Sequence, residues 1–171
     1  MLQPLRRVWF GIKERMFIRR FASRAERFSA IHADNMWKNP ETASGYGSTL
    51  AATAQLRAAL QSLIDTNDVR SILDAPCGDF NWQGELRFTG HYTGLDIVPA
   101  LIEQNRANYG QVGREFAVAD IVEDSLPGAD LVLGDAEVAV GAVQVAAHLD
   151  VVLAGHQNAP PASNWAAGIV A

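Results

Sequence analysis

Cysteine is nearly absent from this chain of 171 residues, which contains only Cys77. A single thiol excludes an internal disulfide framework and a zinc site built from several thiolates. No run of 18 or more residues is free of charged or strongly polar side chains, so no transmembrane helix is predicted. The N-terminus also lacks the apolar region and cleavage site of a secretory signal, and we therefore expect a cytoplasmic protein.

Lysine and arginine are missing from residues 115–171, which hold eight acidic residues. Residues 1–30 hold eight basic and two acidic residues, so the formal net charge of −5 conceals a strong gradient along the chain. A folded surface normally mixes both signs. We therefore expect a basic arm at residues 1–30 and a second unit at residues 31–171, with an atypical tail at residues 134–171.

The basic arm has an amphipathic helical pattern. Leu5, Val8, Ile12 and Met16 recur at helical spacing, and arginines fill much of the remaining surface. We favour packing of the apolar stripe on the body of the same chain. The alternative is an arm that touches an anionic membrane surface or nucleic acid, although the sequence carries no strong signal for nucleic-acid binding.

From residue 69 onward, short apolar segments alternate with helical or loop segments. The predicted strands are residues 69–73, 92–95, 116–119 and 130–133, and the predicted helices are residues 50–64 and Pro99–Tyr109. The first three strands run into Asp74, Asp96 and Asp120, which lie 22 and 24 residues apart. This spacing suits strand–helix–strand crossovers and predicts a Rossmann-like α/β fold with a mainly parallel sheet and flanking helices.

Three strands that each finish on an aspartate place carboxylates along one rim of such a sheet, where ligands bind. An aspartate after the second strand can accept hydrogen bonds from both hydroxyls of a ribose. One after the third strand can accept a hydrogen bond from an exocyclic amine. Strand ends are commonly polar, but three aspartates in this register predict a nucleoside-type ligand.

The turn after the first strand reads Asp-Ala-Pro-Cys-Gly-Asp-Phe-Asn-Trp over Asp74–Trp82. A dinucleotide site normally needs three glycines that let the backbone approach a pyrophosphate. Here only Gly78 is a glycine, and Asp79 would repel a pyrophosphate. The turn therefore favours a ligand with a charged amine and no phosphates, which makes a nicotinamide-dependent oxidoreductase the least favoured function.

This turn, together with Ser44–Ser48 upstream and residues 94–99 downstream, resembles class I S-adenosylmethionine-dependent methyltransferases. These motifs look like those of one bacterial subgroup with the loop D-x-P-C-G-D-F-N-W, and the resemblance covers roughly residues 37–133. Pro76 departs from the usual pattern by standing at its first glycine. The resemblance implies S-adenosylmethionine as cofactor and in-line transfer of its methyl group to an unidentified acceptor.

The resemblance also implies nine cofactor-binding residues: Gly45, Gly47, Asp74, Cys77, Gly78, Asp96, Ile97, Asp120 and Ile121. Gly45 and Gly47 would close the site over the methionine carboxylate. Asp74, Cys77 and Gly78 would wrap the methionine part. Asp96 would hold the ribose and Ile97 would pack on the adenine, with Asp120 and Ile121 at the other side of the adenine ring. From the residues alone, Cys77 is better explained as a packing residue than as a nucleophile, because it lacks an evident His or Lys partner. The segment around Gly45 can also be an ordinary loop before a helix capped by Ser48 or Thr49.

The acceptor site is not identified by the sequence. Residues 133–137 are not the Asn/Asp-Pro-Pro-Tyr/Phe run of many methyltransferases that act on exocyclic or amide nitrogen. Asp135, His148 and His156 are candidates for orienting or deprotonating an acceptor, but no catalytic residue is assigned. The spacing of the acidic and histidine residues predicts no metal site.

The tail at residues 134–171 contains eleven Ala, seven Val and four Gly. We expect a shortened chain whose end differs from that of the resembled family, with a change of reading frame as one origin. Such a chain could be a cofactor-binding module with weak catalysis. The alternative is a reduced variant whose sheet is completed by residues 138–145 and 151–153.

Deletion of residues 1–24 tests the two interpretations of the basic arm. Packing on the body predicts a lower melting temperature and newly exposed apolar surface, measured by thermal unfolding and dye binding. An unchanged melting temperature together with loss of salt-sensitive binding to anionic vesicles would favour the alternative.

Overall fold

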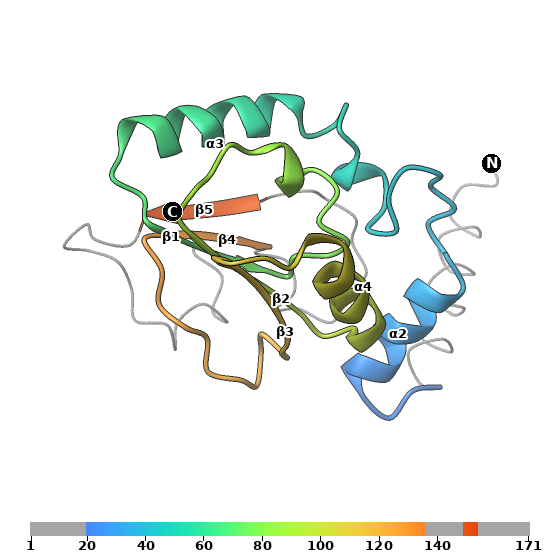
Figure 1. Ribbon diagram of the computed structural model, residues 1–171. Helices are drawn as coiled ribbons and strands as arrows, with labels where there is room; N and C mark the ends of the chain where they lie inside the picture. The colour runs from blue at the N-terminus through green and yellow to red at the C-terminus, as the bar shows by residue number, and fades with distance from the viewer. Residues whose placement is uncertain (1–19, 136–148, 154–171) are drawn as a thin grey trace, which may run out of the picture.

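A five-stranded sheet forms the centre of the protein in the computed structural model, which describes residues 20–135 and 149–153 (Figure 1). The strands are β1 (Ser71–Ala75), β2 (His91–Asp96), β3 (Arg114–Val118), β4 (Leu131–Asp135) and β5 (Leu149–Leu153). Their order is β3-β2-β1-β4-β5; the first four are parallel, and β5 is antiparallel to β4. The predicted Rossmann-like, mainly parallel α/β fold is confirmed.

All four predicted strands are present, with ends shifted by one or two residues. Asp74 and Asp96 lie inside β1 and β2, not beyond them, whereas Asp120 follows β3 by two residues. In the register, Asp74 pairs with Gly94 of β2 on one side and with Leu133 of β4 on the other. β5 includes residues 151–153, one of the two segments that the reduced-variant interpretation placed in the sheet, and residues 138–145 lie outside the described residues.

Three α-helices are described: α2 (Arg24–Ala33), α3 (Ala54–Thr66) and α4 (Pro99–Tyr109). α4 has the predicted bounds, and Asn67 ends α3 as expected. α3 begins later than the predicted caps, because Thr49 instead stabilises a preceding turn in which its hydroxyl accepts the Ala52 N–H.

α2 begins after Ser23, whose hydroxyl accepts the Glu26 N–H, and it runs across the predicted boundary between residues 30 and 31. The expected arm and the expected second unit therefore share one helix. The rest of the arm, residues 1–19, lies outside the described residues.

The crossovers differ from the predicted strand–helix–strand pattern. In the described part of the chain, only the connection from β2 to β3 contains an α-helix, α4. The connection from β1 to β2 contains only a short 3₁₀ helix, Gln83–Glu85, and residues 119–130 form no helix before β4. The connection from β1 to β2 lacks an α-helix because proline and glycine disfavour a helix interior, and this segment contains Pro76, Gly78, Gly84 and Gly90.

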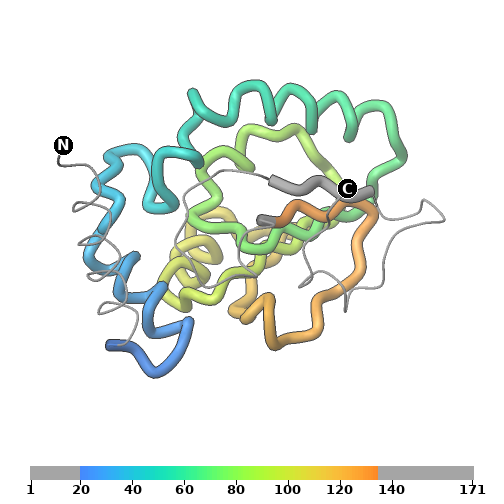
Figure 2. Tube along the Cα trace, turned by 180° about the vertical axis from the view of Figure 1, so that it is seen from behind, coloured from blue at the N-terminus to red at the C-terminus, as the bar shows by residue number. Residues whose placement is uncertain are grey.

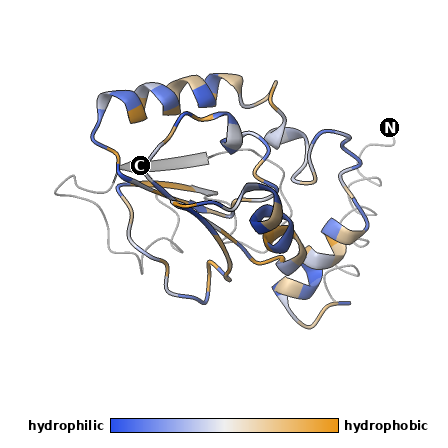
Figure 3. Ribbon diagram, viewed as in Figure 1, coloured by the Kyte–Doolittle hydropathy of each residue, from blue (hydrophilic) through white to orange (hydrophobic). Residues whose placement is uncertain are grey.

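The two faces of the sheet are covered differently. On one face, Ile72, Tyr92 and Leu133 pack with Leu60 of α3 and Ile102 of α4. On the other, Leu73, Ala75 and Leu95 pack against half-buried residues of the segment between β3 and β4, which Figure 2 shows from behind as the orange loop. Both kinds of residue occur along α3 and α4, whose hydrophilic positions alternate with hydrophobic ones (Figure 3). The described helices that pack on the sheet therefore share one face, and loop residues cover the other.

Phe80 anchors the loop after β1 in this core. Its side chain is 2% exposed, and its ring lies 5.1 Å from that of Tyr92, 5.3 Å from that of Phe116 and 5.0 Å from that of Tyr109. The Arg114 guanidinium lies 5.0 Å from the Phe80 ring. Phe80 has φ +59°, an uncommon conformation for a bulky residue, which persists because the packed ring holds the loop in place.

Phe80→Ala should lower the free energy of unfolding by about 3–5 kcal/mol, because it leaves a cavity among three aromatic rings. Denaturant unfolding measures the effect. Val112→Ala, at a fully exposed position, is the control and should change stability by no more than about 0.5 kcal/mol. Equal effects of the two variants would show that Phe80 is not an anchor.

Candidate functional site

The carboxyl ends of β1, β2 and β3 meet at one edge of the sheet. Asp96 lies there at the end of β2 and is 6% exposed. Its Oδ2 accepts the Gly78 N–H at 3.0 Å, and its Oδ1 accepts the Val98 N–H at 2.9 Å. Since a carboxylate has two lone pairs on each oxygen, Asp96 can accept further hydrogen bonds beyond these two contacts.

The environment of Asp96 balances burial against hydrogen bonding. Burial raises the pKa of its carboxyl group, and the backbone N–H groups of Val98, Gly78 and Ile97 oppose that rise by favouring the charged form. His32 of α2 also favours the charged form of Asp96, so this helix comes close to the end of β2. The Nδ1 atom of His32 is buried and has no hydrogen-bond partner among the described residues.

Gly78 lies directly over Asp96 in a conformation that favours glycine. Its φ is +54°, and a Cβ at this position would lie 2.3 Å from Ser44 Oγ. The Gly78 carbonyl accepts a hydrogen bond from Asn105 Nδ2 at 2.7 Å, which ties the loop to α4. The loop after β1 is therefore held from three directions: by β2, by α4 and by the segment that contains Ser44.

Asp79 connects the two glycine-containing motifs that the sequence analysis singled out. Its carboxylate accepts hydrogen bonds from Thr42 Oγ1 at 2.9 Å, Ala43 N at 2.6 Å and Ser44 Oγ at 3.0 Å. The Asp79 N–H in turn donates to Ser44 Oγ at 3.0 Å. The sequence analysis treated Asp79 only as a charge that disfavours phosphate and missed this role. Hydroxyl residues at positions 42 and 44 were the available signal, but spacing alone could not pair them with a residue 35 positions away.

The segment held by Asp79 contains two of the predicted site residues. Gly45 is buried with φ +89°, and a Cβ there would lie 3.5 Å from the Trp37 ring. Gly47 lies in the short 3₁₀ helix Tyr46–Ser48, and Tyr46 between the two glycines is 69% exposed. The structure therefore brings the Gly45 segment next to the Gly78 loop, as the predicted site requires.

Asp74, in contrast, points into the interior beneath this loop. It is 1% exposed, and its Oδ2 accepts both the Tyr92 hydroxyl at 2.5 Å and Gln83 Nε2 at 2.8 Å. Gln83 Nε2 also donates to the Cys77 carbonyl at 3.0 Å, so Asp74 supports the loop through Gln83. Burial raises the pKa of Asp74 to about 7; the two hydrogen bonds limit the rise, and the charge of Asp96 adds to it.

Cys77 behaves as a packing residue, in agreement with the sequence-based interpretation. It is 2% exposed, its N–H donates to the Leu95 carbonyl at 2.8 Å, and its thiol lies 3.8 Å from Asn105 Nδ2. Burial, together with the charges of Asp74 and Asp96, raises the pKa of the thiol far above its usual value. A thiol that stays protonated is a poor nucleophile.

The remaining predicted residues lie at the ends of β2 and β3. Ile97 and Ile121 are half-buried, and Ile121 packs against the cluster formed by Leu73 and its neighbours. Asp120 is held near the end of β2, because the backbone N–H of the preceding residue, Ala119, donates to the Asp96 carbonyl at 3.0 Å. The Asp120 carboxylate is paired with Arg24 of α2, a contact that the sequence analysis did not anticipate.

Of the three acceptor candidates, only Asp135 falls within the described residues, and its neighbour Gly134 pairs with Ala75 at the end of β1. His148 and His156 lie outside the described residues, and Asp135 is the last residue of β4. Within residues 20–135 and 149–153, no group of three or more His, Cys, Asp or Glu side chains is arranged to hold a metal ion. No helix in the same ranges has the length and apolar character needed to cross a membrane.

Comparison with known proteins shows only distant structural likeness. No protein-family model matches the chain, and no curated protein matches it either. The fold is similar to the crystal structure of human N-acetylserotonin methyltransferase in complex with SAM, with 17% identity over 61% of this chain and 38% of that one, at a TM-score of 0.33. It is also similar to the apo form of the S-adenosylmethionine-dependent methyltransferase SibL, with 20% identity over 76% of this chain and 46% of that one, at a TM-score of 0.42. The chain thus spans less than half the length of either protein, and likeness at this level carries no argument about function.

Asp74→Asn tests the buried acid beneath the loop. The unfolded chain releases this proton near pH 4, whereas the folded chain keeps it to about pH 7, so this group lowers the free energy of unfolding as pH rises through that window. Asparagine can accept both hydrogen bonds through its single oxygen without carrying a charge. The variant should therefore lose a pH dependence of up to about 1.4 kcal/mol per pH unit between pH 4 and 7.

Denaturant unfolding at several pH values measures this slope. Tyr92→Phe keeps the ring but removes a donor that favours the charged form, so it should extend the window to higher pH. An unchanged slope in Asp74→Asn would contradict the assignment.

Proposed function

We propose that this protein binds S-adenosylmethionine at the carboxyl edge of β1–β3 and transfers its methyl group to an acceptor that is not identified. The observation that carries the proposal is the anchored carboxylate of Asp96. The backbone N–H groups of Gly78 and Val98 fix its orientation, and the carboxylate can accept further hydrogen bonds beyond these contacts. Two adjacent hydroxyls of a ribose are a matching pair of donors.

The surrounding residues fit the rest of this cofactor. Asp120 follows the neighbouring strand and can accept a hydrogen bond from an adenine amino group. Asp96, together with the excess acid in the contact of Arg24 with Asp120 and Glu123, gives this edge a negative character, which suits a ligand with a sulfonium and an ammonium group. The N–H groups of Gly78 and Asp79 already donate to Asp96 and to Ser44 Oγ, so neither is left for a phosphate. These features favour S-adenosylmethionine over a dinucleotide.

The cofactor, when bound, supplies an activated methyl group on sulfur. The chain's own task is to hold the ribose and the adenine, to exclude water and to align an acceptor with the methyl group. Asp96 and Asp120 serve the first part of this task. The loop at Gly78 and the segment at Gly45, joined through Asp79, cover the methionine end. The cytoplasmic location expected from the sequence belongs to the same proposal.

A second candidate is a cofactor-binding module with little or no turnover. It is favoured by the composition after β4, where the chain becomes rich in Ala and Val and contains no Lys or Arg. Incubation with methyl-labelled S-adenosylmethionine and a cell extract distinguishes the two functions. Labelled product supports the enzyme, whereas cofactor binding without label transfer supports the module.

Asp96→Ala should weaken the binding of S-adenosylhomocysteine by about 10- to 100-fold, because hydrogen bonds to a charged group contribute roughly 1.5–3 kcal/mol. Calorimetry gives the affinity, and a thermal melt checks that the variant is folded. Glu103→Ala removes the same charge from an exposed position of α4 and serves as the control. Unchanged affinity in a folded Asp96→Ala would contradict the assignment, as would binding of NAD in place of S-adenosylhomocysteine.

A further inference from the structure

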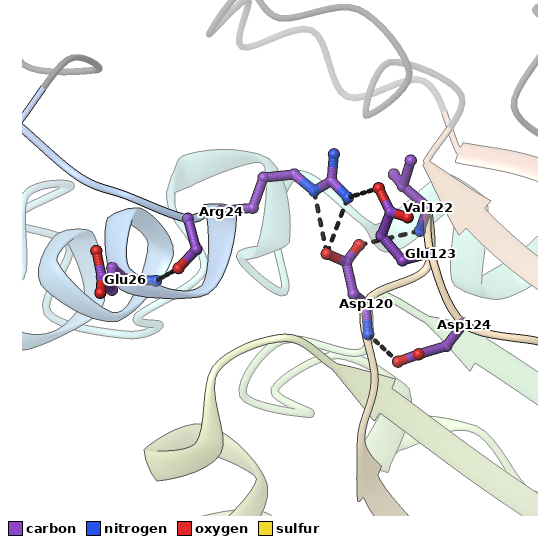
Figure 4. A network of polar contacts seen from close by, with 7 residues as sticks. Arg24, Glu26, Asp120, Val122, Glu123 and Asp124 are labelled. Carbon is purple, nitrogen blue, oxygen red and sulfur yellow. Dashed lines mark hydrogen bonds and ion pairs between the residues drawn. The ribbon is translucent and has the colours of Figure 1, made fainter.

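Arg24 joins α2 to the loop after β3 through a three-residue ionic contact (Figure 4). Its Nε and Nη2 atoms both donate to Asp120 Oδ2, at 3.1 and 2.9 Å, and Nη2 also donates to Glu123 Oε1 at 3.0 Å. Arg24 is the first residue of α2, directly after the capping Ser23. The side chains of Arg24 and Asp120 are 32% and 25% exposed, so this pair is partly shielded from solvent.

The hydrogen bonds of Asp120 leave it with one acceptor position. Both positions on Oδ2 are taken by Arg24, and Oδ1 accepts the Val122 N–H at 3.1 Å. The backbone is fixed as well, because the Asp120 N–H donates to Asp124 Oδ2 at 2.8 Å and the Asp120 carbonyl accepts the Asp124 N–H at 2.8 Å. The carboxylate cannot rotate without breaking several of these contacts, so its last acceptor position has a fixed direction.

The same helix also approaches the other acid of the site. His32, near the C-terminal end of α2, favours the charged form of Asp96, and its Nδ1 is buried without a partner in the described part of the chain. Figure 1 shows α2 beside α4, at the end of the sheet where the parallel strands finish. α2 thus lies near this edge of the sheet, and Arg24 fastens its N-terminal end to the loop after β3.

We propose that Arg24 is a positioning residue for adenine recognition: it fixes Asp120 so that the remaining lone pair of Oδ1 accepts a hydrogen bond from the purine amino group. This inference rests on the proposed function. A carboxylate is an acceptor only, so a fixed carboxylate favours an amino group over a carbonyl oxygen at the same purine position. Without Arg24 the carboxylate can rotate and take up water, and the preference falls.

The test compares two ligands that differ only at this purine position. S-adenosylhomocysteine carries the amino group, and S-inosylhomocysteine carries a carbonyl oxygen. Calorimetry on the full chain gives both affinities for the wild type, Arg24→Ala, Arg24→Lys and Arg20→Ala. The last variant removes the same charge from an exposed neighbouring position and is the control.

We expect the wild type to prefer the amino ligand by about 10- to 100-fold, the range of one hydrogen bond to a charged group. Arg24→Ala should reduce this preference at least several-fold, and Arg24→Lys should reduce it less, because lysine keeps the charge but not the planar pair of donors. Arg20→Ala should leave the preference unchanged.

If Arg24 had only a structural role, Arg24→Ala would weaken the binding of both ligands equally and leave the ratio of the two affinities unchanged. This result would overturn the inference. Wild-type binding without any preference for the amino ligand would also overturn it, while the proposed function would stand. Failure of the wild type to bind either ligand would overturn the proposed function and the inference with it.

Discussion

The hydrogen bond from the Gly78 N–H to Asp96 closes the loop after β1 onto the end of β2, and the geometry of the whole edge depends on it. The loop can make this contact because Gly78 adopts a positive φ and has no Cβ to strike Ser44. Ser44 is in turn held by Asp79. Two stretches of chain more than thirty residues apart are thereby joined through one glycine and two carboxylates.

Phe80 opposes the tendency of such a polar loop to open. The residues before it are fixed by hydrogen bonds that water can also make, and such bonds contribute modestly to stability. The Phe80 ring is buried among Tyr92, Phe116 and Tyr109, so opening the loop would expose a large apolar surface. The site therefore has a polar upper surface and an apolar anchor, both encoded within the few residues that follow β1.

The three aspartates near the carboxyl ends of β1, β2 and β3 have three different environments. Asp74 is enclosed in the core, where burial raises its pKa to about 7, and it supports the loop from below through Gln83. Asp96 is held by backbone N–H groups at the rim. Asp120 is paired with an arginine from a distant helix. In our proposal only Asp96 and Asp120 accept hydrogen bonds from a ligand at the edge of the sheet. The regular spacing of the three aspartates in the sequence therefore does not give them the same chemical role.

The sequence by itself determined the order of strands and helices, because apolar periodicity, Pro99 and Gly110 are local signals that act within a few residues. It also indicated which strand ends carry acids, since each acid directly follows a short apolar segment in the sequence. Spacing could not show that Asp74 points inward and Asp96 points to the rim, because each strand's exact end decides the direction of its side chains. Nor could it pair Asp79 with Ser44 or Arg24 with Asp120, since contacts between residues 35 and 96 positions apart exist only once the sheet has brought their loops together.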